Sequence, residues 1–465
     1  MRTQVGSPLA GLYAYSNRFL ETMGQAHGVG SPLGAWSLLA LLAHDAPAGM
    51  RPELEAVLGC DAAEAHAFVL SLLEQDHPAV AVAFGAWILE SAATPAWSEW
   101  LARLPSSIAR GPMPTQAEAD AWMSKATRGQ IARLPLEIGP LSAALLASGI
   151  AMDGRWQCAF DVASSDELGP HQFEQHVERV LLRSDLPHSA LVRTEAAGIV
   201  GALVQEAREA YAVISVVAPE GSSRATAIAA AHEVAAMWQG STYSSNISLF
   251  DLPVGDGPDW SIEEREFEDV SGPKRRERST VYIPAWDAED SKIDLLGHPD
   301  DGFTAAIPLF KSRLKPAEPD YTFEAAQAAK ARFHQYGFTA AAGTAFMATR
   351  GASFRESVYR CVERHLTLRF RRPFAAVAVA KSPREYQDMK RMVVPFRAGP
   401  HPWENVPCFS AWVTRPTEVA LLAPGDSMDE WEKLFDFPEP IPEVPPPTGI
   451  RRMLAFFDRF RGKPA

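Results

Sequence analysis

The fold of this chain is decided by residues 327–353, which read QAAKARFHQYGFTAAAGTAFMATRGAS. Ala329, Ala331 and Phe333 alternate with charged or polar residues, and this two-residue period predicts a half-buried β-strand. Gly337 then permits a bend in the backbone. The residues after the bend carry almost no side chain. A predicted strand is therefore followed directly by a run of residues with very small side chains.

The slender run admits two interpretations. It could form an Ala-rich helix, because Ala is the best helix former. However, glycine and β-branched threonines interrupt it, and no polar face alternates with an apolar one. A run of small residues could instead slide between two strands of an existing sheet at little steric cost. Its members are Thr339, Ala340, Ala341, Ala342, Gly343 and Thr344.

A strand, a hinge glycine, a small-residue run and an exposed loop together resemble the reactive loop of serpins. The hinge glycine, the alanines and the final threonine match the family's pattern, whereas its acidic pair is absent and Phe338 stands where a small Thr or Ser is usual. Residues 366–374, LTLRFRRPF, followed by AAVAVA, are similar to the family's strand after the loop. This Arg-Phe-x-x-Pro-Phe motif is more specific than the alanine run.

Other segments extend the resemblance over residues 8–420. Ser31, as an N-cap, and Pro32, as the first helical residue, look like the family's Ser-Pro-Leu helix start. Residues 152–160, which include Trp156, are similar to a segment at the top of the family's main sheet. A charged, proline-rich insertion at residues 381–407 departs from the family pattern.

The resemblance implies an α+β serpin fold, with three β-sheets surrounded by about eight to nine helices. It implies a suicide inhibitor of a serine protease rather than an enzyme, whose cleaved loop inserts into the main sheet as an extra strand. The alternative is a non-inhibitory serpin-fold binding or scaffold protein. The residues expected to open the sheet are Ser31, Pro32, Trp156 and Gln327, and the expected hinge runs from Gly337 to Thr344.

The scissile bond has two candidate positions. Counting from Gly337 as the family's hinge glycine gives the Gly351–Ala352 bond, and one residue less gives Arg350–Gly351. Arg350 is preferred on chemical grounds, because a trypsin-like S1 pocket holds a carboxylate for Arg. Phe338 would be the first inward-facing residue to enter the sheet, so we expect it to overpack a tight slot and slow insertion.

Composition limits the remaining classes. A net charge of −13 argues against a nucleic-acid binder. The four cysteines are widely spaced, which predicts free, mostly buried thiols and no metal site. No secretory signal, membrane span, HExxH or GxSxG motif appears, so we expect a cytoplasmic monomer without a cofactor rather than a hydrolase.

Three charged segments complete the sequence. Residues 274–278, KRRER, predict a solvated turn or, alternatively, a polyanion site. Residues 421–449 form an acidic, proline-rich linker. Residues 450–465 contain a short basic amphipathic helix, 450–461, which either docks on the acidic body or contacts a partner or a membrane surface.

Overall fold

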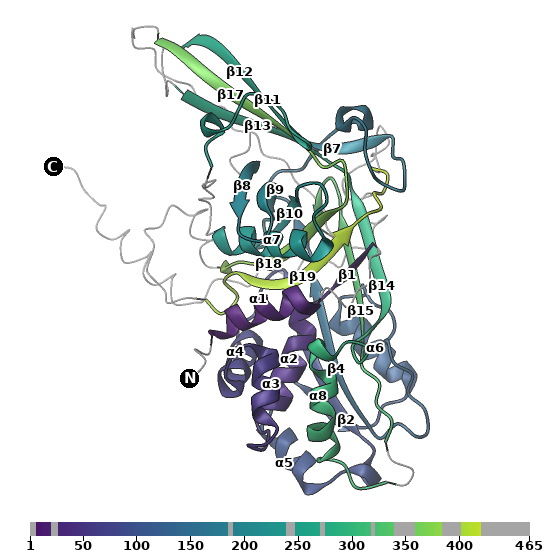
Figure 1. The fold of residues 1–465 in the computed structure, drawn as a ribbon. Helices are drawn as coiled ribbons and strands as arrows, with labels where there is room; N and C mark the ends of the chain where they lie inside the picture. The colour runs from purple at the N-terminus through teal and green to yellow at the C-terminus, as the bar shows by residue number, and fades with distance from the viewer. Residues whose placement is uncertain are drawn as a thin grey trace, which may run out of the picture.

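The computed structural model describes residues 6–19, 27–184, 189–238, 247–269, 275–317, 321–338, 359–383 and 401–419. These residues form an α+β fold in which helices gather at one end and β-sheets extend along the length of the molecule (Figure 1). The predicted linker at 421–449, the C-terminal helix at 450–465 and residues 384–400 of the insertion lie outside the described part of the chain.

The α-helices of the described chain include a hydrophobic central helix, α2, surrounded by amphipathic ones. Apolar residues lie all around α2, which is typical of a helix buried inside a core. As predicted, Ser31 caps α2 and Pro32 is its first residue. The helices are α1 (Pro8–Phe19), α2 (Pro32–Ala43), α3 (Arg51–Leu58), α4 (Ala62–Glu74), α5 (Pro95–Arg103), α6 (Gln116–Ala126), α7 (Arg224–Met237) and α8 (Phe303–Lys311).

The strands divide among four hydrogen-bonded sheets. Their bounds are β1 (Gly28–Gly30), β2 (Val80–Ile88), β3 (Ala109–Pro112), β4 (Ala144–Met152), β5 (Gly154–Arg155), β6 (Asp161–Ser164), β7 (Arg179–Ser184), β8 (Ser189–Thr194), β9 (Gly198–Glu206), β10 (Tyr211–Val217), β11 (Gly255–Asp256), β12 (Trp260–Asp269), β13 (Arg275–Ile283), β14 (Trp286–Asp294), β15 (Ala326–Phe333), β16 (Gly337–Phe338), β17 (Tyr359–Arg369), β18 (Phe374–Ala380) and β19 (Val406–Val413).

The innermost sheet has the order β1-β19-β18-β10-β9-β8. Every residue of β10 and β18 is buried, because α7 packs against these two strands and the main sheet covers their other face. The sequence of β18, FAAVAVA, suits this position, since only small or β-branched apolar side chains fit between two packed layers. This sheet therefore provides the fixed body on which the main sheet rests.

The serpin resemblance predicts three sheets. In the structure one of them, here called the main sheet, is divided into two hydrogen-bonded parts, which makes four in all. One part has the order β14-β15-β16-β5 and the other β3-β2-β4. The remaining sheet has the order β11-β12-β17-β13-β7-β6, and its strands β12, β17 and β13 project from the upper end of the molecule (Figure 1).

Most elements predicted from the sequence are confirmed. The alternating strand expected before Gly337 is β15, and the segments LTLRFRRPF and AAVAVA expected to form strand structure after the loop contribute to β17 and β18. Cys60, Cys361 and Cys408 are buried free thiols, whereas Cys158 is exposed. The solvated turn predicted at 274–278 is wrong for its described residues, because Arg275 begins strand β13.

The three arginines of that basic segment are also engaged. Arg275 lies over the ring of Phe250 and Arg276 over that of Phe267. The Nε atom of Arg278 lies 2.9 Å from a carboxylate oxygen of Glu363. A polyanion site would need free cations there, so the alternative interpretation of this segment finds no support among its described residues.

Asp301 carries a buried carboxyl group beneath α1. Its side chain is fully buried, and neither carboxylate oxygen has a hydrogen-bond partner in the described structure. Burial, reinforced by the negative charge of Asp300, raises the pKa of Asp301 to about 8, against an opposing effect of Arg18. The unfolded chain ionises this group near its ordinary value, so the folded state loses stability as the pH rises toward 8.

We therefore expect Asp301→Asn to raise the free energy of unfolding at pH 8 by on the order of 1–3 kcal/mol. At pH 3 the variant and the wild type should be similar, because the carboxyl group is then mostly neutral in both the folded and the unfolded state. Urea unfolding between pH 3 and pH 8 measures the difference, with Asp256→Asn, an exposed position on β11, as control. Parallel pH profiles for Asp301→Asn and the wild type would contradict the assignment.

Candidate functional site

The hinge predicted at Gly337 begins as a short strand that is already seated in the main sheet. After β15 the chain turns through residues 334–336, and β16 then pairs antiparallel with β15 through Phe338 and Phe333. On its other side β16 pairs with β5, Gly337 facing Arg155 and Phe338 facing Gly154. The two residues of β16 therefore occupy the top of a position between two strands.

Below β16 the main sheet is open. Strand β4 pairs with β2 and strand β15 pairs with β14, but no ladder joins β4 to β15, although the structure describes both strands completely. Because β5 follows β4 after a single residue, β4 and β15 flank a gap directly beneath β16. Their facing edges carry backbone groups that an additional strand would pair.

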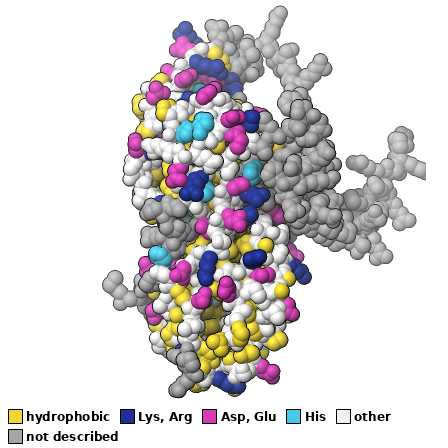
Figure 2. Space-filling view, turned by 90° about the vertical axis from the view of Figure 1, so that its right-hand side faces the viewer, with side chains coloured by type: hydrophobic (Ala, Val, Ile, Leu, Met, Phe, Trp, Pro, Cys, Tyr) yellow, Lys and Arg dark blue, Asp and Glu magenta, His cyan; other side chains and the backbone are white. Residues whose placement is uncertain are grey.

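Helix α2 forms the floor of this gap at Gly34. A Cβ atom at this position would lie 3.0 Å from Oγ of Ser148 on β4 and 3.5 Å from Nε2 of Gln327 on β15. The two edges therefore approach the same point of α2 so closely that only glycine fits without displacing a neighbour. Figure 2 shows hydrophobic side chains gathered on the lower half of the face where β2, β4 and α6 lie.

The predicted sheet-opening residues fall into two groups. Both polar atoms of the Gln327 side-chain amide bind the backbone of Ser31, at 2.7 Å to its N and 2.8 Å to its O. Ser31 Oγ also donates to the carbonyl oxygen of Cys408, 2.8 Å away. Ser31, Pro32 and Gln327 thus meet where β15 begins, about 20 Å along β15 from the hinge.

Trp156 lies at the opposite end of β15 and holds the turn that leads into the hinge. Its indole Nε1 donates to the carbonyl oxygen of His334 at 2.8 Å, and its backbone N donates to that of Tyr336 at 3.0 Å. Gln335 is bound in the same way, through two hydrogen bonds to the backbone of Phe160. Residues 156–160 therefore fix the turn before Gly337.

Phe338 occupies a pocket made for an aromatic ring. Its side chain is 3% exposed, and its ring centroid lies 6.2 Å from that of Tyr211 and 6.3 Å from that of Trp286. Small residues of the innermost sheet, Ala376 and Ala378, line the space beside it. Phe338 is thus already buried beside small neighbours in the intact protein, and the expectation that it slows insertion stays a prediction.

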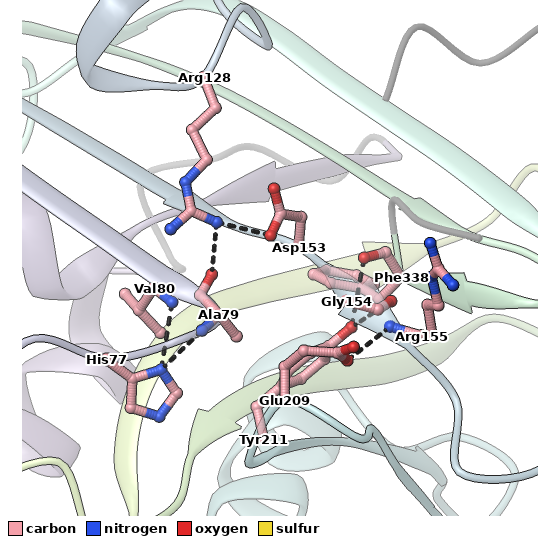
Figure 3. Close-up of polar contacts among 10 residues, drawn as sticks. All are labelled: His77, Ala79, Val80, Arg128, Asp153, Gly154, Arg155, Glu209, Tyr211 and Phe338. Atoms are coloured by element: carbon pink, nitrogen blue, oxygen red, sulfur yellow. Dashed lines mark hydrogen bonds and ion pairs between the residues drawn. The ribbon is translucent and has the colours of Figure 1, made fainter. Parts of the chain in front are cut away.

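A set of polar contacts surrounds the top of the gap (Figure 3). Tyr211 Oη lies 2.9 Å from the carbonyl oxygen of Gly154 and 3.3 Å from that of Phe338, so its hydroxyl binds both strands that meet there. A carboxylate oxygen of Glu209 accepts from the backbone N of Arg155 at 2.7 Å. Burial raises the pKa of Glu209, and this hydrogen bond opposes the rise.

Arg128 connects helix α6 to the same region. Its φ of 51° is unusual for a residue other than glycine, and its guanidinium lies 2.5 Å from a carboxylate oxygen of Asp153 and 3.3 Å from the carbonyl oxygen of Ala79. Burial raises the pKa of Asp153, while Arg128 favours its ionised form. The ion pair joins the end of α6, the start of β2 and the link between β4 and β5.

His77 braces the start of β2 from below. Its Nδ1 accepts from the backbone N atoms of Ala79 and Val80, both at 3.1 Å, and its Nε2–H donates to the carbonyl oxygens of Ala210 and Lys381. Only the neutral ring satisfies this pattern. Burial lowers the pKa of His77 to about 4, so the ring stays neutral through mildly acidic pH.

Sequence reasoning missed most of this polar rim. The segments that contain Arg128, Asp153 and Arg155 stood out only as fragments of a resemblance, and nothing in the sequence indicated that His77, Glu209 and Tyr211 would converge on the hinge. The rest of the predicted hinge, Thr339 to Thr344, and the scissile candidates Arg350, Gly351 and Ala352 lie outside the described residues. The described ranges also contain no group of three potential metal ligands and no single helix able to cross a membrane.

Comparison with known proteins identifies the architecture. No family model matches the chain, and no curated protein resembles it significantly in sequence. Solved serpin structures match over nearly the whole fold. The native state of tengpin, a thermophilic serpin, matches with a TM-score of 0.56 and 13% identity, over 87% of this chain and 93% of tengpin.

Two further serpins match to a similar extent. Serpin48 from the insect Tenebrio molitor gives a TM-score of 0.52 and 12% identity, over 90% of this chain and 100% of that structure. Thyroxine-binding globulin in complex with thyroxine gives 0.53 and 13%, over 89% and 99%. The chain therefore has the serpin fold, and the fold class predicted from its sequence is confirmed.

The contacts of Tyr211 yield a test of how the hinge is held. Tyr211→Phe removes the hydroxyl that binds Phe338 and Gly154, so hydrogen exchange in the peptide covering residues 330–338 should become roughly fivefold faster, as loss of one hydrogen bond predicts. Tyr13→Phe is the matched control, since its hydroxyl binds Asn405 in a different part of the fold. Equal exchange in both variants would show that the hydroxyl does not hold the hinge.

Proposed function

We propose that this protein is a serpin-type suicide inhibitor of a serine protease. The proposal is carried by one observation: among the residues that the structure describes, β16 lies at the top of a gap whose two edges, β4 and β15, are joined by no ladder and have no other strand between them. A sheet divided in this way has room for one more strand. The loop that would supply the strand leaves β16 at the mouth of the gap.

The proposed reaction begins with attack by the protease. Its serine Oγ forms an ester with the carbonyl carbon of the scissile residue, the peptide C–N bond breaks, and the freed amine leaves with a proton. We assign the scissile residue to Arg350, with Gly351 as the alternative, and a trypsin-like enzyme as the target. The acyl-enzyme then remains attached to the N-terminal part of the loop.

Insertion would follow the register that β16 has begun. Continuing the antiparallel pairing of Phe338 with Phe333 places Ala345 opposite Ala326, the first residue of β15. Ala340, Ala342 and Thr344 would then share the inward face with Phe338. Each new backbone hydrogen bond contributes roughly 0.5–1.5 kcal/mol, so about a dozen inserted residues with their apolar burial give on the order of 10–20 kcal/mol.

A non-inhibitory binding or scaffold protein is the second candidate. It is supported by thyroxine-binding globulin, a serpin-fold structure in complex with a small molecule, and by two segments of the sequence that depart from the family pattern. These segments are the insertion at 381–407 and the basic helix at 450–461, which would contact a partner or a membrane surface. We further propose that the protein acts as a monomer in the cytoplasm, a compartment that suits four free thiols.

Mixing the protein with trypsin-like and subtilisin-like proteases tests the proposal. We expect an SDS-stable adduct whose mass is the sum of the protease and the loop-cleaved chain, formed with the trypsin-like enzyme and abolished by Arg350→Ala. The control Ala342→Arg buries an unpaired charge in the sheet and should convert most of the adduct into simply cleaved protein. Cleavage without any adduct from wild type would favour the scaffold protein.

The same assay measures the role of Phe338. Because its ring is buried before cleavage and stays in place afterwards, Phe338→Thr should affect the intact and inserted states alike. We expect the ratio of adduct to cleaved product to change less than twofold, while the intact protein loses roughly 3 kcal/mol of stability. A large rise in this ratio would show that the phenylalanine does obstruct insertion.

A further inference from the structure

The strand that follows the loop, β17, is enclosed on both sides. It pairs in parallel with β13, from Val362 opposite Arg275 to Arg369 opposite Tyr282. On its other side it pairs antiparallel with β12 along its full length, from Tyr359 opposite Asp269 to Leu368 opposite Trp260. The edge of this sheet is thus formed by β11 and β12, and β17 is an interior strand.

The two ladders that hold β17 between β12 and β13 are called the clamp below. Ion pairs reinforce this clamp on one face of the three strands. Glu363 of β17 is 1% exposed, and it binds Arg265 of β12, at 2.6 Å from Nε, and Arg278 of β13, at 2.9 Å from Nε. Withdrawing β17 would separate a buried carboxylate from both of its partners, and a buried charge without partners is strongly unfavourable.

The other face has its own cross-strand contacts. Arg364 pairs with Glu264, which lies directly opposite on β12 at 2.8 Å, and also donates to the carbonyl oxygens of Leu249 and Leu252. Arg360 lies 3.4 Å from Glu266. Oppositely charged side chains therefore pair across both faces of the β12–β17 ladder, which favours this register.

The clamp limits how much of the intact loop can enter the gap, because the loop has a fixed length. Continuing the register of Phe338 opposite Gly154 down to Ala144, the first residue of β4, would use the chain as far as residue 348. Residues 349–358 would then have to return to Tyr359, and fully extended they span at most about 37 Å. The strands β12, β17 and β13 lead away from β14 and β15 (Figure 1), so Tyr359 lies at the far tip of the projection.

The return path is longer than the remaining chain. The gap beside β4 and the length of β17 each correspond to about 33 Å of strand. Even if the gap and β17 met at a right angle, the bottom of the gap at Ala144 and the start of β17 at Tyr359 would lie about 47 Å apart, which is more than residues 349–358 can span. An intact loop can therefore fill the gap only if residues are pulled out of β17, beginning at Tyr359.

From this geometry we infer that β12 is a lock strand, which makes insertion of the loop conditional on its cleavage. Cleavage separates the inserting segment from β17, so the clamp no longer opposes insertion. In the intact protein the clamp would keep Tyr359 and the residues after it in their own sheet, so the uncleaved chain could not supply the length that full insertion needs. This inference rests on the proposed function in assuming that the cleaved loop inserts, whereas the clamp itself can be measured independently.

The first measurement is hydrogen exchange in the intact wild-type protein. Amides of β17 from Cys361 to Leu368 should be protected to the same degree as those of the buried strand β10. Exchange as fast as in the edge strand β3 would overturn the inference, whatever the loop does after cleavage.

The second measurement is the conversion of uncleaved protein to a more stable form below its melting temperature. The variant Glu264→Lys with Arg265→Glu places like charges opposite Arg364 and Glu363, so it should convert at least tenfold faster than wild type, with an intact mass. The control is Glu263→Lys, an exposed position on the same strand. Conversion of uncleaved wild type, or no acceleration in the variant relative to the control, would overturn the role of β12.

A cleaved sample separates the two proposals. Protein cut once between Thr349 and Arg355 should melt at a markedly higher temperature if the loop inserts. An unchanged melting temperature would refute the proposed inhibitory function, while the exchange data would still decide whether β17 is clamped.

Discussion

The structure depends on two residues of backbone pairing, Gly337 and Phe338 between β15 and β5. At this point β16 joins β15 to β5, and below it no ladder among the described residues joins β4 to β15. The backbone groups on these two edges need solvent or another group to satisfy them, and a further strand could do so. The polar contacts of Arg128 with Asp153, and of Tyr211 with Gly154 and Phe338, hold the upper end of the gap together.

The side chain of Phe338 gives this arrangement its stability. The ring lies among Tyr211, Trp286 and Phe333, a cluster that also packs against Trp156. Aromatic pairs of this kind contribute about 0.5–1.5 kcal/mol beyond their buried area. The residues that follow offer much less, because an alanine side chain gains little from burial. The first step into the sheet is thus driven by side-chain contacts, and later steps would depend on backbone pairing.

How far the sequence predicts this fold depends on the range of the interactions involved. The period of β15, the Ser31 cap of α2 and the all-apolar β18 are local signals, and each predicted its element. The seating of Phe338 was not predictable in this way, because its pocket is built by Ala376 and Ala378, far along the chain and on a different sheet. For the same reason the basic residues at 275–278 suggested a turn, although their cross-strand partners Phe250, Phe267 and Glu363 stabilise a strand.

The described residues that flank the loop on its two sides are held by different means. At the first end, Phe338 is already buried and the residues that follow it, as far as Thr344, are small, so they would offer little steric resistance before Phe346. At the second end, β17 is held by ladders on both sides and by a buried carboxylate shared between two arginines. In the proposed mechanism the intact loop would therefore be limited by its anchor at β17 rather than by the small residues that follow Phe338. A cut between the two anchors would free the inserting segment from β17, so strand pairing would no longer be opposed.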